Sequence, residues 1–239
     1  MDNNLKDYRE KELKNYVIGN ALIILVLSGT FDVLLNLHGL NSDINEALSK
    51  IVVELISAGL FSSILYTYVF IFDAIIPGNW KDTICNLWRP LPGEVIFDEM
   101  EQRVKDKRFT KDAILKKYAD VYERLKDLTG KKRRDVSNSA WYAVYRKLED
   151  ETKIFISNRD YLLCRDLCVS TLWIGLMYCI LCRLSILAFN CNLVTLLGIE
   201  LLATNIAMRS KQRRFAYNVI AADIHPKETH QQNETVSKK

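Results

Sequence analysis

Long apolar blocks constrain the fold of this chain more than any other feature. Two of them cover residues 16–37 and 51–76, and a third stretch is almost continuously apolar over residues 167–208. The charged residues, 26% of the chain, lie mainly between these blocks. A helix of about 20 apolar residues rises roughly 30 Å, which is the thickness of the hydrocarbon core of a bilayer. We therefore predict an integral membrane protein.

The final apolar stretch is too long for one crossing, even in a tilted helix. Its central polar cluster, Asn190-Cys191-Asn192, predicts a turn between one helix over 167–189 and another over 193–208. The preceding run 157–166 is expected to continue as helix into the first of these two. The Pro77-Gly78 pair ends the second block, because proline cannot continue a helix. The sequence thus predicts an all-α fold with four crossings, arranged as two transmembrane hairpins.

The positions of Lys and Arg predict the orientation, because positively charged segments near membrane ends stay in the cytosol. Such residues precede the first block, follow the last and are dense between the second and third, whereas the 39–50 connection contains only Lys50. Both termini are therefore expected in the cytosol, and in a bacterium the membrane would be the inner membrane. The start of the chain lacks a short apolar stretch with a small-residue cleavage site, so the first block is interpreted as a retained anchor. The expected divisions are a cytosolic segment over 1–15, hairpins over 16–76 and 167–208, a cytosolic insert over 77–166, and a basic then polar tail over 209–239.

The insert is expected to be a small helical domain. Between residues 110 and 128, apolar residues recur at three- and four-residue steps and so lie on one face of a helix. Thr110 is placed to cap the start of this helix and Gly130 to close its end. Weaker apolar stripes predict further short helices over 94–108 and 137–148. Three such helices can bury a modest core.

Five ionisable residues lie in or beside the apolar blocks, where a charge at the bilayer centre costs about 2.5–3.5 kcal/mol and tends to be paired or functional. They are Asp32, Glu54, Asp73, Arg183 and Glu200. In an antiparallel hairpin Arg183 and Glu200 come to similar depth. They are expected either to form an ion pair or to separate, with Arg183 at the outer surface and Glu200 facing a neighbouring helix. Asp32 and Glu54 are either solvated at the interface or line a wet cavity, and Asp73 is interpreted as interfacial.

Small residues four positions apart allow helices to approach closely, within one chain or between copies. The pairs are Ala58/Ser62 and Gly59/Ser63 in the second block and Ala203/Ala207 in the last. Packing within the chain is the commoner use of such pairs. Packing between copies gives a homo-oligomer, which is the state we expect in the membrane.

Two basic clusters flank the predicted crossings and are expected to contact the headgroups of anionic membrane lipids. They comprise Lys131, Lys132, Arg133, Arg134, Arg209, Lys211, Arg213 and Arg214. Basic clusters with nearby aromatic residues also occur in nucleic-acid surfaces. We do not expect nucleic acid as a partner, because acidic residues nearly balance the basic ones in the insert.

The common signatures of enzymes are missing from the sequence, which has no phosphate-binding Gly-rich loop, no His-Glu-x-x-His and no Gly-x-Ser-x-Gly. The three histidines, His38, His225 and His230, are too far apart in the predicted topology for a triad or a metal cluster. The six cysteines lack the paired spacing of a zinc site in a soluble loop and are interpreted as small apolar residues. The main expectation is therefore a chain without catalytic residues, metal or other cofactor.

The layout of two membrane hairpins around a small cytosolic helical insert resembles that of four-pass effectors with which bacterial defence systems perturb the inner membrane. The resemblance is one of layout and rests on no motif. It implies a non-enzymatic effector that oligomerises and opens a pore or leak when the insert binds a soluble partner or a small-molecule trigger. Two alternatives stay open. One is a membrane scaffold or accessory subunit that recruits a soluble partner, and the other is a membrane-bound enzyme that uses insert carboxylates such as Glu94, Asp98 and Glu99.

Overall fold

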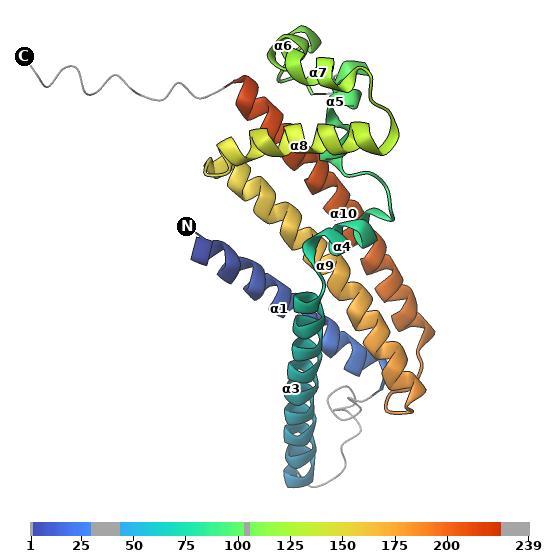
Figure 1. Ribbon diagram of the computed structural model, residues 1–239. Helices are drawn as coiled ribbons and strands as arrows, with labels where there is room; N and C mark the ends of the chain where they lie inside the picture. The colour runs from blue at the N-terminus through green and yellow to red at the C-terminus, as the bar shows by residue number, and fades with distance from the viewer. Residues whose placement is uncertain (1, 30–43, 103–105, 226–239) are drawn as a thin grey trace, which may run out of the picture. The chain divides into compact units, whose positions relative to one another are not determined.

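The computed structural model describes residues 2–29, 44–102 and 106–225, and every regular element in these ranges is an α-helix (Figure 1). The helices are α1 (Asp2–Leu27), α3 (Ile44–Ile75), α4 (Gly78–Asn86), α5 (Pro92–Gln102), α6 (Lys111–Lys117), α7 (Ala119–Leu125), α8 (Gly130–Leu148), α9 (Thr152–Arg183) and α10 (Cys191–Ile224). The predicted all-α class is confirmed for this part of the chain.

Internal contacts divide the chain into two compact units. Unit 1 lies within residues 1–88 and 162–209, and unit 2 within residues 89–161 and 210–239. Two of the three division points fall inside long helices, because α9 and α10 are each continuous across them, and the third lies between α4 and α5. The residue divisions that the sequence predicts relative to a membrane remain predictions, since these units are defined by contacts within the chain alone.

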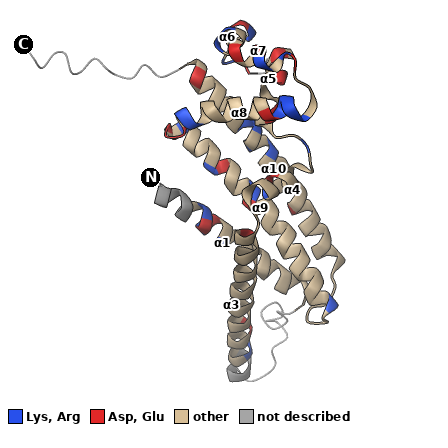
Figure 2. Cartoon of the chain, in the orientation of Figure 1, with Lys and Arg blue, Asp and Glu red and all other residues tan. Residues whose placement is uncertain are grey.

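Three helices are long and apolar enough to cross a membrane, namely Leu48–Ile75 of α3, and α9 and α10. Much of their apolar surface has no protein cover, since Leu60 on α3 and Leu202 on α10 are 61% and 66% exposed. Figure 2 shows few charged residues along α3 and along the parts of α9 and α10 that adjoin their connecting turn. Soluble proteins seldom expose apolar surface on this scale, whereas lipid covers it without penalty. These helices therefore indicate membrane association.

The turn between α9 and α10 includes Asn190 of the predicted polar cluster, but it starts at residue 184, earlier than the predicted helix end at residue 189. α9 ends at Arg183 and α10 begins at Cys191. The Asn190 side-chain oxygen accepts the backbone N–H groups of Asn192 and Leu193, at 2.9 and 3.3 Å, and so caps α10. The Asn190 amide nitrogen donates to the carbonyl of Leu27 at 2.5 Å, which ties this turn to the end of α1. The expected continuation of residues 157–166 into α9 is also confirmed.

The first apolar block is not a single helix over residues 16–37. α1 contains its beginning but ends at Leu27, and Gly29 follows with φ +71°, a left-handed conformation that terminates helices. The helical part of the block, from Tyr16 to Leu27, rises only about 18 Å and is too short to cross a bilayer. The rest of the block, which includes Asp32, lies outside the described residues. The four-pass topology therefore remains a prediction, with three crossings supported.

Unit 1 has an apolar core to which four helices contribute. Its buried members are Leu13, Val17, Ala21 and Ile24 from α1, Leu65 and Val69 from α3, Ile174 and Tyr178 from α9, and Leu193 and Leu197 from α10. Because lipid is as apolar as these side chains, close packing rather than exclusion of water holds such a core together in a bilayer. A change of side-chain volume in this core is therefore expected to disturb the packing of all four helices.

Unit 2 has the buried aromatic core typical of a water-soluble helical domain. Phe97 on α5 packs edge-on against Tyr118, with ring centroids 5.3 Å apart. Phe215 on α10 packs against Trp141 of α8 at 5.5 Å and against Tyr161 of α9 at 6.1 Å. Aromatic pairs in this range add about 0.5–1.5 kcal/mol to the burial of their area. These contacts join α5, α8 and the polar ends of α9 and α10 into one core.

Two details of the insert differ from the sequence prediction. The expected helix over 110–128 is broken at Tyr118 (φ −112°, ψ 29°) into α6 and α7. The break lets the Tyr118 hydroxyl donate to Asp223 at 2.7 Å while its ring packs on Phe97. Thr110 caps α6 as predicted, accepting the N–H of Ala113 at 3.3 Å. Gly130 begins α8 instead of closing the preceding helix.

The hairpin of α9 and α10 predicts opposite sides for two positions. In a variant whose exposed Cys179 and Cys191 are replaced by Ser, a cysteine introduced at Asn192 should react with an impermeant maleimide added to intact cells. A cysteine introduced at Lys131 in α8 should react only after the cells are permeabilised. Labelling of both positions from the same side would contradict the predicted orientation.

Candidate functional site

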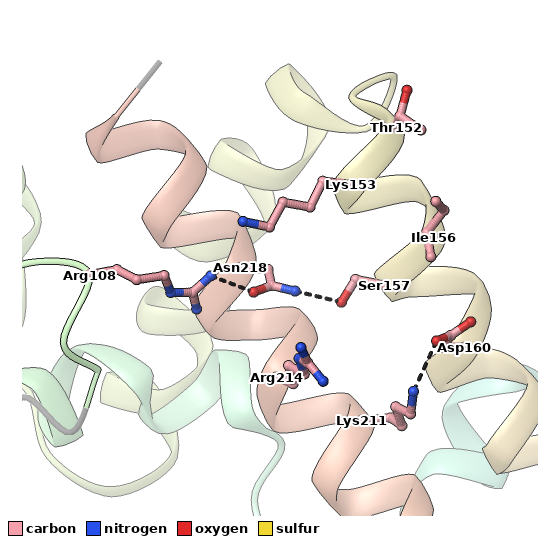
Figure 3. A pocket seen from close by; sticks show the side chains of 9 residues that line it. All are labelled: Arg108, Thr152, Lys153, Ile156, Ser157, Asp160, Lys211, Arg214 and Asn218. Atoms are coloured by element: carbon pink, nitrogen blue, oxygen red, sulfur yellow. Dashed lines mark hydrogen bonds and ion pairs between the residues drawn. The ribbon is translucent and has the colours of Figure 1, made fainter. Parts of the chain in front are cut away.

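Unit 2 contains a pocket of about 770 Å³ between the start of α9 and the second half of α10 (Figure 3). On α10, positions 211, 214 and 218 recur at three- and four-residue steps and so share one face. The lining comprises Arg108, Thr152, Lys153, Ile156, Ser157, Asp160, Lys211, Arg214 and Asn218. Four of these residues are cationic and one is a carboxylate, so the pocket is positively charged.

Arg108 is fixed at one wall of the pocket by two partners. Its Nη1 donates to the side-chain oxygen of Asn218 at 2.7 Å, and its Nε and Nη2 donate to Asp106 at 2.5–3.0 Å. Asn218 is buried and donates in turn to the Ser157 hydroxyl at 3.0 Å. The hydrogen bond from the Arg108 side chain holds the pKa of Asp106 below its usual value. The guanidinium is thereby positioned and partly neutralised.

Asp160, the carboxylate of the lining, is also paired. Lys211 donates to Asp160 Oδ2 at 2.9 Å, and Arg159 donates to Oδ1 at 2.9 Å. Asp160 therefore offsets the charge of its two partners.

Lys153 and Arg214 differ from the other cations of the lining. Both are exposed, and neither forms an ion pair with any described residue. Figure 3 shows Lys153 reaching from α9 toward α10. The pocket therefore presents two positive charges outside the described ion pairs, and Lys153 also acts electrostatically on the nearby Asp106.

A second hollow of about 520 Å³ adjoins the first and shares Arg108 and Arg214 with it. Its further lining is Asp106, Lys107, Ser210, Arg213 and Tyr217. The Arg213 guanidinium lies 5.7 Å from the centre of the Tyr217 ring, and both side chains donate to Glu99, at 2.5 and 3.0 Å. Together the two hollows carry six cationic side chains and two carboxylates.

Unit 1 contains a separate cluster of charges at the junction of α1, α4 and α9. Asp166 is only 3% exposed and accepts hydrogen bonds from Arg9 on α1 and from Arg165, at 3.1 Å to Nη2. Arg165 also lies 3.5 Å from Asp82 on α4. Because a buried charge without a counter-charge is costly, this network fixes the position of α1 against α9.

Asp73, expected at the interface, lies at the end of α3 and pairs with Lys81 of α4. The Asp73–Lys81 distance is 2.6 Å, and the lysine side chain is 7% exposed. The pair spans the Pro77-Gly78 turn and closes it. Asp73 therefore has a structural role in joining two helices.

Of the two arrangements expected for Arg183 and Glu200, the described residues show the separated one, with no ion pair between them. Glu200 accepts a hydrogen bond from the Tyr16 hydroxyl at 3.1 Å, and that hydroxyl also contacts Thr171 at 2.7 Å. Arg183 is exposed at the last position of α9. The depth argument assumed helix up to residue 189, but α9 ends at Arg183, so the arginine stays beside the turn while Glu200 lies deeper along α10.

The small-residue pairs separate into inward and outward faces. Ala58 and Ser62 are buried, and Ala58 packs in a cluster with Leu25 of α1. Their outward counterparts, Gly59, Ser63, Ala203 and Ala207, are all exposed. Glu54 is half-buried and precedes Ala58 and Ser62 at four-residue steps, so it lies on the inward face of α3.

The two basic clusters are not uniformly available to lipid. Arg133 donates to the backbone carbonyl of Leu125 and pairs with Asp98 at 2.7 Å. Arg209 is half-buried. Lys131, Lys132 and Arg134 are exposed along α8, whereas Lys211, Arg213 and Arg214 line the two hollows. Lipid contact by these residues stays a prediction.

The insert carboxylates considered for catalysis each have a structural partner. Glu94 accepts the N–H of Leu91 at 3.0 Å at the start of α5, while Asp98 and Glu99 pair with Arg133 and Arg213. Such contacts give no support to a carboxylate-based active site. Within residues 2–29, 44–102 and 106–225, no group of three His, Cys, Asp or Glu side chains is placed to hold a metal ion.

Sequence reasoning found only part of the pocket. Lys211 and Arg214 belong to a predicted basic cluster, but Arg108 and Asn218 are 110 residues apart in the sequence and meet only in the folded unit. The basic residues between positions 209 and 214 were the sequence feature that pointed to the pocket. Comparison with protein-family models, with curated proteins and with solved structures found no match to this chain. The chemistry of the described residues therefore carries the functional argument.

The Asp166 network predicts a large loss of stability when it is broken. Replacing Asp166 by Asn should lower the free energy of unfolding in detergent by about 3–5 kcal/mol, because two arginines lose their buried counter-charge. The matched control is Asp120→Asn, which removes the exposed ion pair with Arg124. That change should cost no more than about 0.5 kcal/mol. Equal effects of the two variants in chemical unfolding would contradict the assigned role.

Proposed function

We propose that the protein is a non-enzymatic membrane effector, which assembles into oligomers through α3 and α10 and opens a leak under the control of unit 2. The observation that carries this proposal is the outward orientation of two small-residue faces. Gly59 and Ser63 on α3, and Ala203 and Ala207 on α10, are exposed. A side chain at Gly59 would meet no atom within 4 Å.

The small-residue faces suit association within a bilayer. The Ser63 hydroxyl donates to the Gly59 carbonyl at 2.8 Å, so its polar group is satisfied within α3. Small residues allow backbones to approach closely, and van der Waals contact then drives association where lipid offers no hydrophobic force. Small residues at these positions are also compatible with a monomer. A measurement of oligomers in the membrane therefore tests the proposal.

Glu200 is the polar residue that this assembly would concentrate. It precedes Ala203 and Ala207 by three and seven positions, so all three lie on one face of α10. Its carboxylate is half-buried and bonded to Tyr16. Packing of several copies through α10 would bring several such carboxylates together and provide a polar path. Glu54 is less suited to this role, because it lies on the inward face of α3.

Unit 2 is the proposed control element because of its helices. α9 and α10 each run without a break from the apolar segments into the residues of unit 2. We propose that a shift or rotation of either helix in unit 2 reaches the apolar segments through this continuous helix. The scaffold alternative shares this construction but requires neither oligomers nor a leak.

Bulky residues on the outward faces should abolish assembly. Ala203→Leu and Gly59→Leu are expected to eliminate cross-linked oligomers and any loss of membrane potential on expression, while membrane insertion stays unchanged. The matched control, Leu202→Phe, adds similar bulk at an exposed position about 100° away on α10. It should retain oligomers and leak. Cross-linking that yields only monomers of the unmodified protein, with membrane potential unaffected, would favour the scaffold alternative.

Neutralising Glu200 should change conduction without preventing assembly. Glu200→Gln keeps an oxygen that can accept the Tyr16 hydroxyl, but it removes the negative charge. Reversal potentials in liposomes with a salt gradient should show reduced preference for cations. Glu54→Gln serves as the control and should leave the preference unchanged. If both variants retain the unmodified selectivity, Glu200 does not line the path.

A further inference from the structure

The two adjoining hollows in unit 2 are large, are lined mainly by cationic side chains and have one wall fixed by hydrogen bonds. Their six cationic side chains face two carboxylates, and those carboxylates are Asp106 and Asp160. Both are already engaged, by Arg108 and by Lys211 and Arg159. Of the other cations, Arg213 pairs with Glu99, whereas Lys107, Lys153 and Arg214 belong to no described ion pair. Repulsion among like charges in one site opposes folding. An anion bound between them would relieve it.

We propose that this site binds a small ligand that carries two or more phosphate groups. Arg108, Lys153 and Arg214 would contact the phosphates. Guanidinium groups match phosphate oxygens with paired donors, and lysine adds a point charge. The site is independent of the leak proposed above, because its geometry and charge are described without reference to oligomers or to conduction.

The size of the site argues for more than a free inorganic ion. The first hollow alone measures about 770 Å³, within the range of roughly 300–1,000 Å³ typical of pockets for organic ligands. The buried Asn218 holds Arg108 on one side and Ser157 on the other, so one wall is preformed. A phosphate ester of nucleotide size fits these properties.

Phosphate groups of this kind occur on soluble metabolites and on lipid headgroups, and the experiment separates the two sources. The full chain is reconstituted in nanodiscs of phosphatidylcholine, which supplies no anionic lipid. Isothermal titration calorimetry then measures binding of ATP and of inorganic tripolyphosphate. In a second arm, native mass spectrometry of the detergent-solubilised chain measures binding of a phosphatidylinositol phosphate. Binding in either arm identifies the source.

Variants show whether the bound probe occupies this site. Lys153→Gln and Arg214→Gln should each weaken binding about tenfold, the loss expected for one charge-assisted hydrogen bond. Both side chains are exposed and outside the described ion pairs, so the fold should survive, as thermal unfolding can verify. Lys131→Gln on α8 is the matched control and should change binding by less than about twofold. Asp160→Asn should tighten binding, which unfolding cannot mimic.

Three results would overturn the proposal. The first is absence of binding in both arms. The second is an affinity for the probe that is the same in Lys153→Gln and Arg214→Gln as in the control Lys131→Gln. The third is displacement of the probe by sulfate at equal concentration, which would reveal exchange of ions on exposed charges. Loss of binding in the first two variants with retention in the control would establish the site, whether or not a leak is ever observed.

Discussion

The uncovered apolar surface of α3 and of the adjoining halves of α9 and α10 is the constraint on which the rest of the structure depends. In water, exposure of side chains such as Leu60 and Leu202 would cost about 25 cal/mol for every Å² of apolar area. In lipid this cost disappears, and the helices satisfy their own backbone hydrogen bonds. Polar side chains in these segments must then find partners locally. Ser63 does so within α3, and Glu200 does so with Tyr16 of α1.

The same constraint explains where the charged residues are paired. Asp166 lies on α9 before its most apolar part and is held between Arg9 and Arg165. Removal of one partner would leave a buried charge without a counter-charge. In the intact network the Asp166 carboxylate is hydrogen-bonded to two arginines. The network also gives α1 a fixed place. α1 contributes four buried side chains to the core of unit 1, and its described helix ends at Leu27.

Local sequence patterns predicted local structure well. The polar cluster at Asn190 marked the turn, and Thr110 marked a helix start, because capping depends on residues close in sequence. The break at Tyr118 could not be predicted in this way, since it follows from contacts with Phe97 and Asp223. The phosphate pocket was hidden for the same reason. Periodicity shows which face of a helix is polar but not which distant segment faces it.

Two errors had a common physical cause. The prediction over residues 16–37 treated an apolar run as one helix, and Gly29 ends it early through a positive φ. The predicted helix over 167–189 likewise ran to the polar cluster, but α9 stops seven residues before Asn190, and Arg183 and Glu200 take the separated arrangement. Hydropathy reports how apolar a segment is and says little about where the backbone leaves the helical conformation.

The account's central claim is that α3 and α10 face lipid, and spin labels test it most directly. Labels at Leu60, Leu202 and Tyr142, the last on α8 in unit 2, would be compared in phosphatidylcholine vesicles by their collisions with oxygen and with a nickel chelate. The account predicts high oxygen and low nickel accessibility at Leu60 and Leu202, with the reverse at Tyr142. High nickel accessibility at Leu60 and Leu202 would show that water covers these helices and would contradict it.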